Sequence, residues 1–144
     1  MRALSDWRDK LAGLGKELQA REQLVAEQKV ATLRAFRQRL AELKPVLEGV
    51  EAFGDAFGVE VDFTISRFDD RYPYLEFRII RPALFLRIEC RDGVIRERLK
   101  EGAAGSREAE LSLEALSPKR VEQRLNSWMQ AAAQANRRVP GRRF

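Results

Sequence analysis

The sequence predicts an α+β fold with a long N-terminal helix, an antiparallel meander of four or five strands and a C-terminal amphipathic helix. Through residues 1–57, apolar residues recur mostly every three or four positions, the period of one helix face, and Arg21 and Gln28 interrupt the series. Across residues 59–113 they alternate with polar residues, as in strands that bury one face. Helical spacing returns after Ser117. We therefore divide the chain into a helical segment (1–57), a sheet with its helix (58–136) and a basic tail (137–144) expected to be disordered.

The N-terminal segment carries a narrow apolar seam of the kind that pairs helices in coiled coils. Gly13, Gly15 and Pro45 are the places where the helix could break, fold back or kink. The residues expected to form an oligomer interface are Leu4, Trp7, Leu11, Leu14, Leu18, Val25 and Leu33.

Element lengths indicate that this seam needs a partner. A helix over residues 16–43 would be roughly 40 Å long at about 1.5 Å per residue. Strands of about eight residues reach only roughly 26 Å. The seam then outruns the sheet, so either the chain folds back on itself or a second copy covers the overhang. We favour a two-fold dimer, with a broken helix packed on its own sheet as the alternative.

The strand region gives a register as well as a fold. Asp92-Gly93 is typical of a two-residue hairpin turn, because such turns need a positive φ at both positions. That turn places Cys90 opposite Ile95 and Arg87 opposite Arg98. A short turn at Arg81-Pro82 would place Phe77 of the preceding strand opposite Leu86, although the loop could be wider by two residues. Residues 107–113 form the expected fifth strand.

The C-terminal helix is expected to begin with Ser117 as its cap and Pro118 as its first residue. Its apolar stripe, expected to face the sheet, consists of Val121, Leu125, Trp128, Ala132 and Ala135.

Composition excludes several kinds of chemistry. The chain has no histidine and a single cysteine, Cys90, so His-based catalysis, His-ligated or Cys-cluster metal sites and an internal disulfide are all ruled out. Carboxylate, lysine or tyrosine chemistry is left, but the carboxylates Glu76 and Glu97 project from opposite faces of the expected sheet. We expect no enzymatic activity, no metal and no cofactor. With no apolar stretch of about 20 residues and no signal-peptide pattern, we expect a cytoplasmic protein without a membrane span.

The net charge of +5 gathers near the C-terminal end. Arg87 opposite Arg98, and Lys119 with Arg120 at the helix start, are candidate anion sites, although carboxylates on neighbouring strands favour plain ion pairing for the first. Candidate nucleic-acid contacts in the tail are Arg137, Arg138, Arg142 and Arg143.

The sequence therefore predicts a non-enzymatic, self-associating protein-interaction module, such as an adaptor, a chaperone-like protein or an assembly protein. Its expected partners are a second copy of itself and an unidentified protein. The alternative is a nucleic-acid-associated protein that acts through the arginine-rich tail. No family resemblance supports either hypothesis, and this fold class alone does not imply a function.

Overall fold

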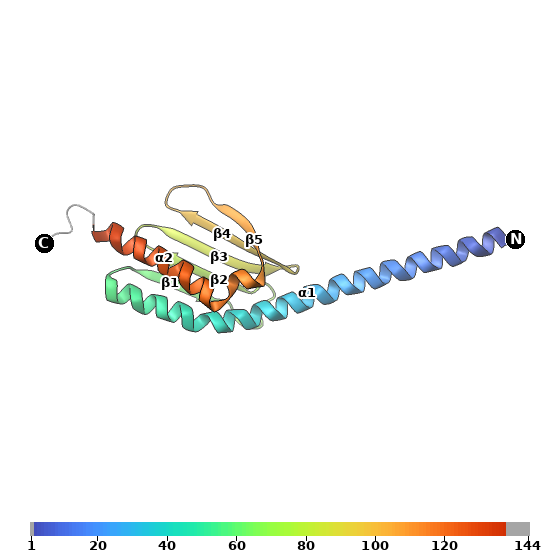
Figure 1. Cartoon of the computed structure of the whole chain (residues 1–144), viewed down its shortest axis with the longest axis horizontal. Coiled ribbons are helices and arrows are strands. Elements are labelled where there is room, and N and C mark those ends of the chain that lie inside the picture. Colours follow the sequence, from blue (N-terminus) through green and yellow to red (C-terminus); the bar gives the residue numbers. More distant parts are fainter. Residues whose placement is uncertain (1, 138–144) are drawn as a thin grey trace.

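The computed structural model of the 144-residue chain describes residues 2–137, with side chains from residue 6 onward. The fold is α+β, as the sequence predicts, in the order long helix, five strands, short 3-10 turn and helix (Figure 1). The elements are α1 (Arg2–Phe57), β1 (Val61–Ile65), β2 (Tyr74–Ile79), β3 (Leu84–Arg91), β4 (Val94–Glu101), β5 (Arg107–Leu111), η1 (Leu113–Leu116) and α2 (Pro118–Arg137).

The first helix is one element of 56 residues. It contains Gly13, Gly15 and Pro45 without interruption, so the alternative of a helix that folds back is wrong. At about 1.5 Å per residue it is roughly 84 Å long. Figure 1 shows it as a single rod, with a gentle bend in its C-terminal half and with its N-terminal half extending away from the rest of the molecule.

Two glycines let the chain leave this helix and enter the sheet. Gly58 follows the last helical residue with a φ of +72°, the left-handed conformation that commonly terminates helices. Gly54 accepts a hydrogen bond from the Val59 amide at 2.9 Å. A Cβ at Gly54 would lie 2.4 Å from the Val59 carbonyl oxygen, so only glycine lets the chain pass this close to α1.

The five strands form one antiparallel sheet in chain order. The predicted register is confirmed on both sides of β3, where Cys90 pairs with Ile95 and Phe77 with Leu86. The Asp92-Gly93 turn has positive φ at both residues, as that register requires. The β2–β3 connection keeps the register expected for a short turn, and its Arg81-Pro82 peptide bond is cis.

The C-terminal region differs from the expectation in two details. The fifth strand ends at Leu111, and Leu113 belongs to η1, which the cap at Ser112 begins. In α2 the buried positions centre on Met129 and include Ala133, whereas Trp128 is half-buried and Ala135 is exposed. Ser117 caps α2 as predicted, and its hydroxyl accepts from the Arg120 amide at 3.3 Å.

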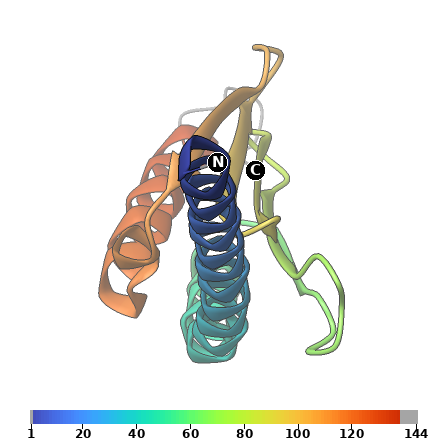
Figure 2. The same cartoon turned by 90° about the vertical axis from the view of Figure 1, so that its right-hand side faces the viewer.

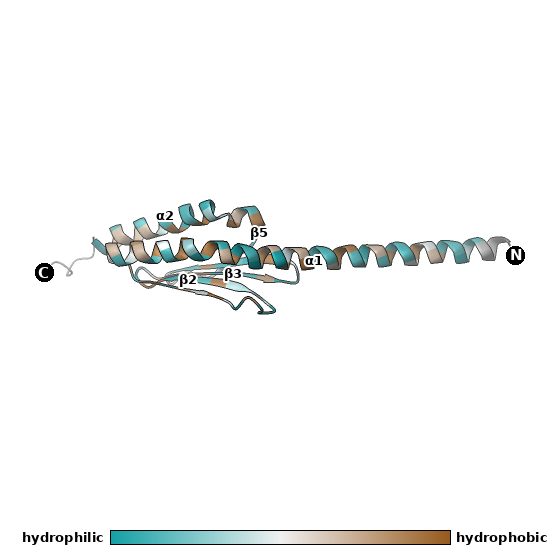
Figure 3. Cartoon of the chain, turned by 90° about the horizontal axis from the view of Figure 1, so that it is seen from below, coloured by the Kyte–Doolittle hydropathy of each residue, from teal (hydrophilic) through white to brown (hydrophobic). Residues whose placement is uncertain are grey.

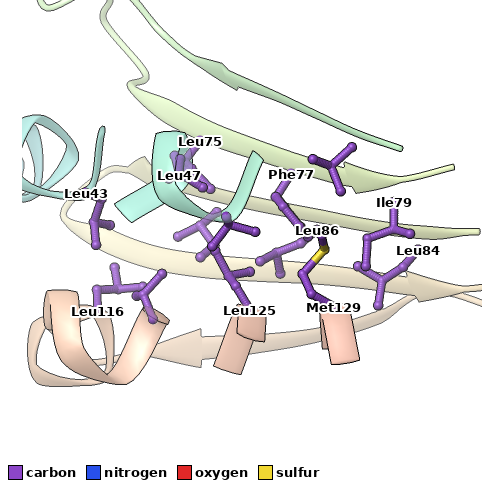
Figure 4. Close-up of a cluster of buried hydrophobic side chains, with 14 of the residues drawn as sticks. Leu43, Leu47, Leu75, Phe77, Ile79, Leu84, Leu86, Leu116, Leu125 and Met129 are labelled. Carbon is purple, nitrogen blue, oxygen red and sulfur yellow. The ribbon is translucent and has the colours of Figure 1, made fainter. Parts of the chain in front are cut away.

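Both helices lie on the same side of the sheet (Figure 2). The core lies between them and the sheet, where Leu43 and Leu47 of α1 meet Leu125 and Met129 of α2 and side chains from β2 and β3 such as Phe77 (Figure 4). From Leu33 onward, α1 contributes to this core. We call residues 33–137 the head. The C-terminal half of α1 therefore packs together with the sheet and does not stand apart from it.

Candidate functional site

The head buries no residue in the N-terminal half of α1, although the β3–β4 turn approaches this helix at Lys29. Every residue from 6 to 30 is exposed, and partial burial begins at Thr32. We call residues 6–30 the free helix. It extends roughly 38 Å at about 1.5 Å per residue. A single α-helix without tertiary packing is only marginally stable in water, and this one also contains two glycines.

Large apolar residues recur along the free helix at the spacing of one helix face. In Figure 3 the ribbon of this segment alternates between hydrophobic (brown) and hydrophilic (teal) residues. Trp7 is 67% exposed, and the other four are about half exposed. We call this set the apolar stripe; it consists of Trp7, Leu11, Leu14, Leu18 and Val25. Burying each such side chain is worth roughly 1.5–3 kcal/mol. Contiguous exposed apolar surface of this kind is typical of a contact site.

The stripe continues the face by which α1 packs onto its own head. Leu18 and the fully buried Phe36 stand eighteen residues apart, which is about five turns at 3.6 residues per turn. They therefore point the same way along a nearly straight helix. Leu33, which the sequence assigned to the interface, packs against the core of its own chain. The side chain of Leu4 lies outside the described part of the structure.

Charged residues border the stripe on both sides, a feature that sequence reasoning missed. Lys10 and Glu17 lie along one border, and Arg8 and Glu22 lie along the other. These are the positions that flank the seam in a heptad repeat, so the repeat itself is the signal that reveals them. Arg21 and Gln28 interrupt the seam beyond Leu18, as the sequence indicated.

The outer face of the sheet is a network of ion pairs. Arg87 donates to Glu76 and, at 3.3 Å, to Glu89, while Arg98 lies 3.2 Å from Glu108. The register confirms that Arg87 stands opposite Arg98, but each guanidinium has a carboxylate partner. The geometry favours the ion-pair interpretation of this surface, and anion binding there stays a prediction.

Aromatic rings near this network are covered by guanidinium groups. Arg87 lies 4.2 Å above the ring of Tyr74, and Arg91 lies 4.3 Å above that of Tyr72. Sheets that bind single-stranded nucleic acid stack bases on open aromatic faces. Here arginines already occupy one face of each ring.

A second ion pair lies under the sheet, where sequence reasoning placed Glu97 but found no partner for it. Glu97 faces the core side of β4 between Ile95 and Leu99, and it is 8% exposed. Arg124 of α2 donates to its carboxylate and lies 4.6 Å from the ring of Trp128. A buried carboxylate requires such a partner, so this pair fixes α2 against β4 and is structural.

The remaining basic candidates lie at the ends of α2. Lys119 and Arg120 are exposed in its first turn, and anion binding by them stays a prediction. Arg137 is the last residue of the helix and is exposed. Arg138, Arg142 and Arg143 lie outside the described residues, so the tail hypothesis also stays a prediction.

Cys90 lies in the core and is completely buried. Burial raises the pKa of its thiol, while the charge of nearby Arg37 lowers it by a smaller amount. The thiol is therefore protonated at neutral pH and shielded from reagents. Among residues 2–137, no three acidic or cysteine side chains gather where they could hold a metal ion.

Comparisons with protein-family models, with curated proteins and with solved structures found no match. None of the helices within residues 2–137 combines the length and apolar character that crossing a bilayer requires.

Proposed function

We propose that this protein is a self-associating interaction module in which the apolar stripe of the free helix binds the stripe of a second copy. The observation that carries the proposal is the exposure of five apolar side chains, at coiled-coil spacing, on a helix that extends beyond its own fold. Pairing would bury the stripe and stabilise a helix that is marginal by itself.

We propose a binding role, and not a catalytic one, for the rest of the molecule as well. Arg87 and Arg98 on the outer sheet face are paired with carboxylates, Cys90 is buried, and Glu76 and Glu97 lie on opposite faces of the sheet. Self-association through the free helix would place two heads in one particle and present two copies of each outer sheet face. That arrangement suits an adaptor or an assembly protein.

Hydrogen exchange at two protein concentrations tests this proposal within a single chain. We expect amides of residues 6–23 to exchange slowly at high concentration and quickly after dilution, because unpaired chains let the free helix fray. Amides of residues 36–50, in the same helix but inside the head, provide the internal control and should not change. Exchange of residues 6–23 that is independent of concentration would contradict self-association.

A further inference from the structure

The charges beside the stripe and the position of the head restrict how two copies can pair. This restriction matters only if the self-association proposed above occurs, and it then sets the geometry of the dimer. In a two-stranded coiled coil, residues of the seam meet in layers, while the flanking charges set partner choice and orientation. Both features can be followed along residues 6–23.

Parallel pairing brings identical positions together, and the free helix is poorly suited to it. Arg21 would meet the partner's Arg21 within the seam. On the border, Glu17 would lie opposite the partner's Glu22, and the two-fold axis would repeat this repulsion. Like charges at such positions are destabilising.

The head obstructs parallel pairing as well. The tip of the β3–β4 hairpin rests on α1, so that a Cβ at Gly93 would lie 2.7 Å from Cγ of Lys29. Because the stripe and the core lie on the same face of α1, this hairpin occupies the path that a parallel partner would follow beyond residue 28. Two parallel chains would have to diverge there.

Antiparallel pairing removes these conflicts. In the register that places Leu11 against the partner's Leu14, Trp7 meets the partner's Leu18, so each of these layers is apolar on both sides. Lys10 then lies opposite the partner's Glu17, and symmetry provides this attraction twice. The two helices overlap along residues 2–23 and stop before the hairpin of either chain.

We propose that two copies pair antiparallel through residues 6–23, with Leu11 against the partner's Leu14 and Lys10 against the partner's Glu17. The two heads then lie at opposite ends of the shared helical rod. Such a dimer presents its sheets far apart and does not join them into one surface.

A charge reversal at one border position distinguishes the two orientations by the sign of its effect. Glu17→Lys places lysine opposite Lys10 in the antiparallel pair, and we expect the dimer dissociation constant to rise about tenfold. In a parallel pair the same change creates an attraction to Glu22 and tightens the dimer. Glu27→Lys, an equal charge change away from the stripe, is the control. Adding Lys10→Glu to Glu17→Lys should restore the affinity. Sedimentation equilibrium at low salt measures the dimer dissociation constant of the unmodified chain, of the two single variants and of the double variant.

Engineered disulfides test the register in the 144-residue chain. Cys90 is buried, so a new cysteine is the reactive thiol. We expect an equimolar mixture of Trp7→Cys and Leu18→Cys to form a disulfide-linked dimer on mild oxidation, and neither variant alone to do so. Linkage within each variant alone would show parallel pairing and overturn the proposal. A dimeric mass with no linkage would also overturn it, by showing another register. A single-chain mass before oxidation would overturn self-association itself.

Discussion

Replacing Leu11 and Leu18 together with aspartate is expected to abolish self-association. Each dimer would lose four buried leucine side chains, each worth roughly 1.5–3 kcal/mol, so the dissociation constant should rise by more than about a hundredfold. The head should remain folded, because both residues are about half exposed and lie outside its core. Sedimentation velocity measures self-association, and near-ultraviolet circular dichroism measures separately whether the head is folded.

The matched control changes the net charge by the same amount, but its substitutions lie on the opposite face of the same helix. Ala20→Asp and Gln23→Asp together add two negative charges, and both positions point away from the stripe. This control also introduces aspartate into the helix interior, where the residue is a poor helix former. We expect the control protein to associate nearly as well as the unmodified chain. Equal loss in both proteins would show that helix propensity, and not the stripe, governs association.

The second large effect is expected at Phe36, where α1 enters the head. Its ring is fully buried between the helix and the sheet, so Phe36→Ala removes a large side chain from a closed core. Such truncations typically reduce the free energy of unfolding by about 3–5 kcal/mol. Urea denaturation at a fixed protein concentration measures the loss, since association would otherwise shift the midpoint.

Val30→Ala is the control for Phe36→Ala on the same helix. Val30 is 56% exposed and lies off the stripe, so its truncation should change the free energy of unfolding by about 0.5 kcal/mol or less. A loss at Val30 as large as that at Phe36 would contradict the division of α1 into a free helix and a packed half.

Much of the sheet could be predicted from the sequence because alternation and turn chemistry constrain each other. Once Asp92-Gly93 fixes the hairpin, each strand has only one register that keeps its apolar residues on one face. The structure has the predicted pairs, from Phe77 with Leu86 to Cys90 with Ile95. Here local chemistry and burial favour the same arrangement.

The continuity of α1 could not be decided from the sequence because local signals and packing act in opposite directions. Gly13, Gly15 and Pro45 disfavour helix at their own positions. Around Pro45, the burial of Leu43 and Leu47 outweighs the missing hydrogen bond. In α2, Trp128 and Met129 stand three and four residues after Leu125, so both fit the helical period and spacing alone does not show which of them is buried.

The pair of Arg124 with Glu97 illustrates a third limit. A carboxylate on the core side of a strand indicates that a basic partner must reach it, but several arginines follow in the sequence. Only the three-dimensional placement of α2 selects Arg124. The charges beside the apolar stripe were accessible in principle, because a heptad assignment identifies Lys10 and Glu17 from their spacing alone.

The mass of the 144-residue chain in solution tests the central claim most directly. Light scattering coupled to size exclusion, at tens of micromolar and over a dilution series, should give twice the 16.6 kDa of one chain and fall toward that value on dilution. A mass of one chain at every concentration would contradict the account, because the apolar stripe would then remain exposed with no second copy to cover it.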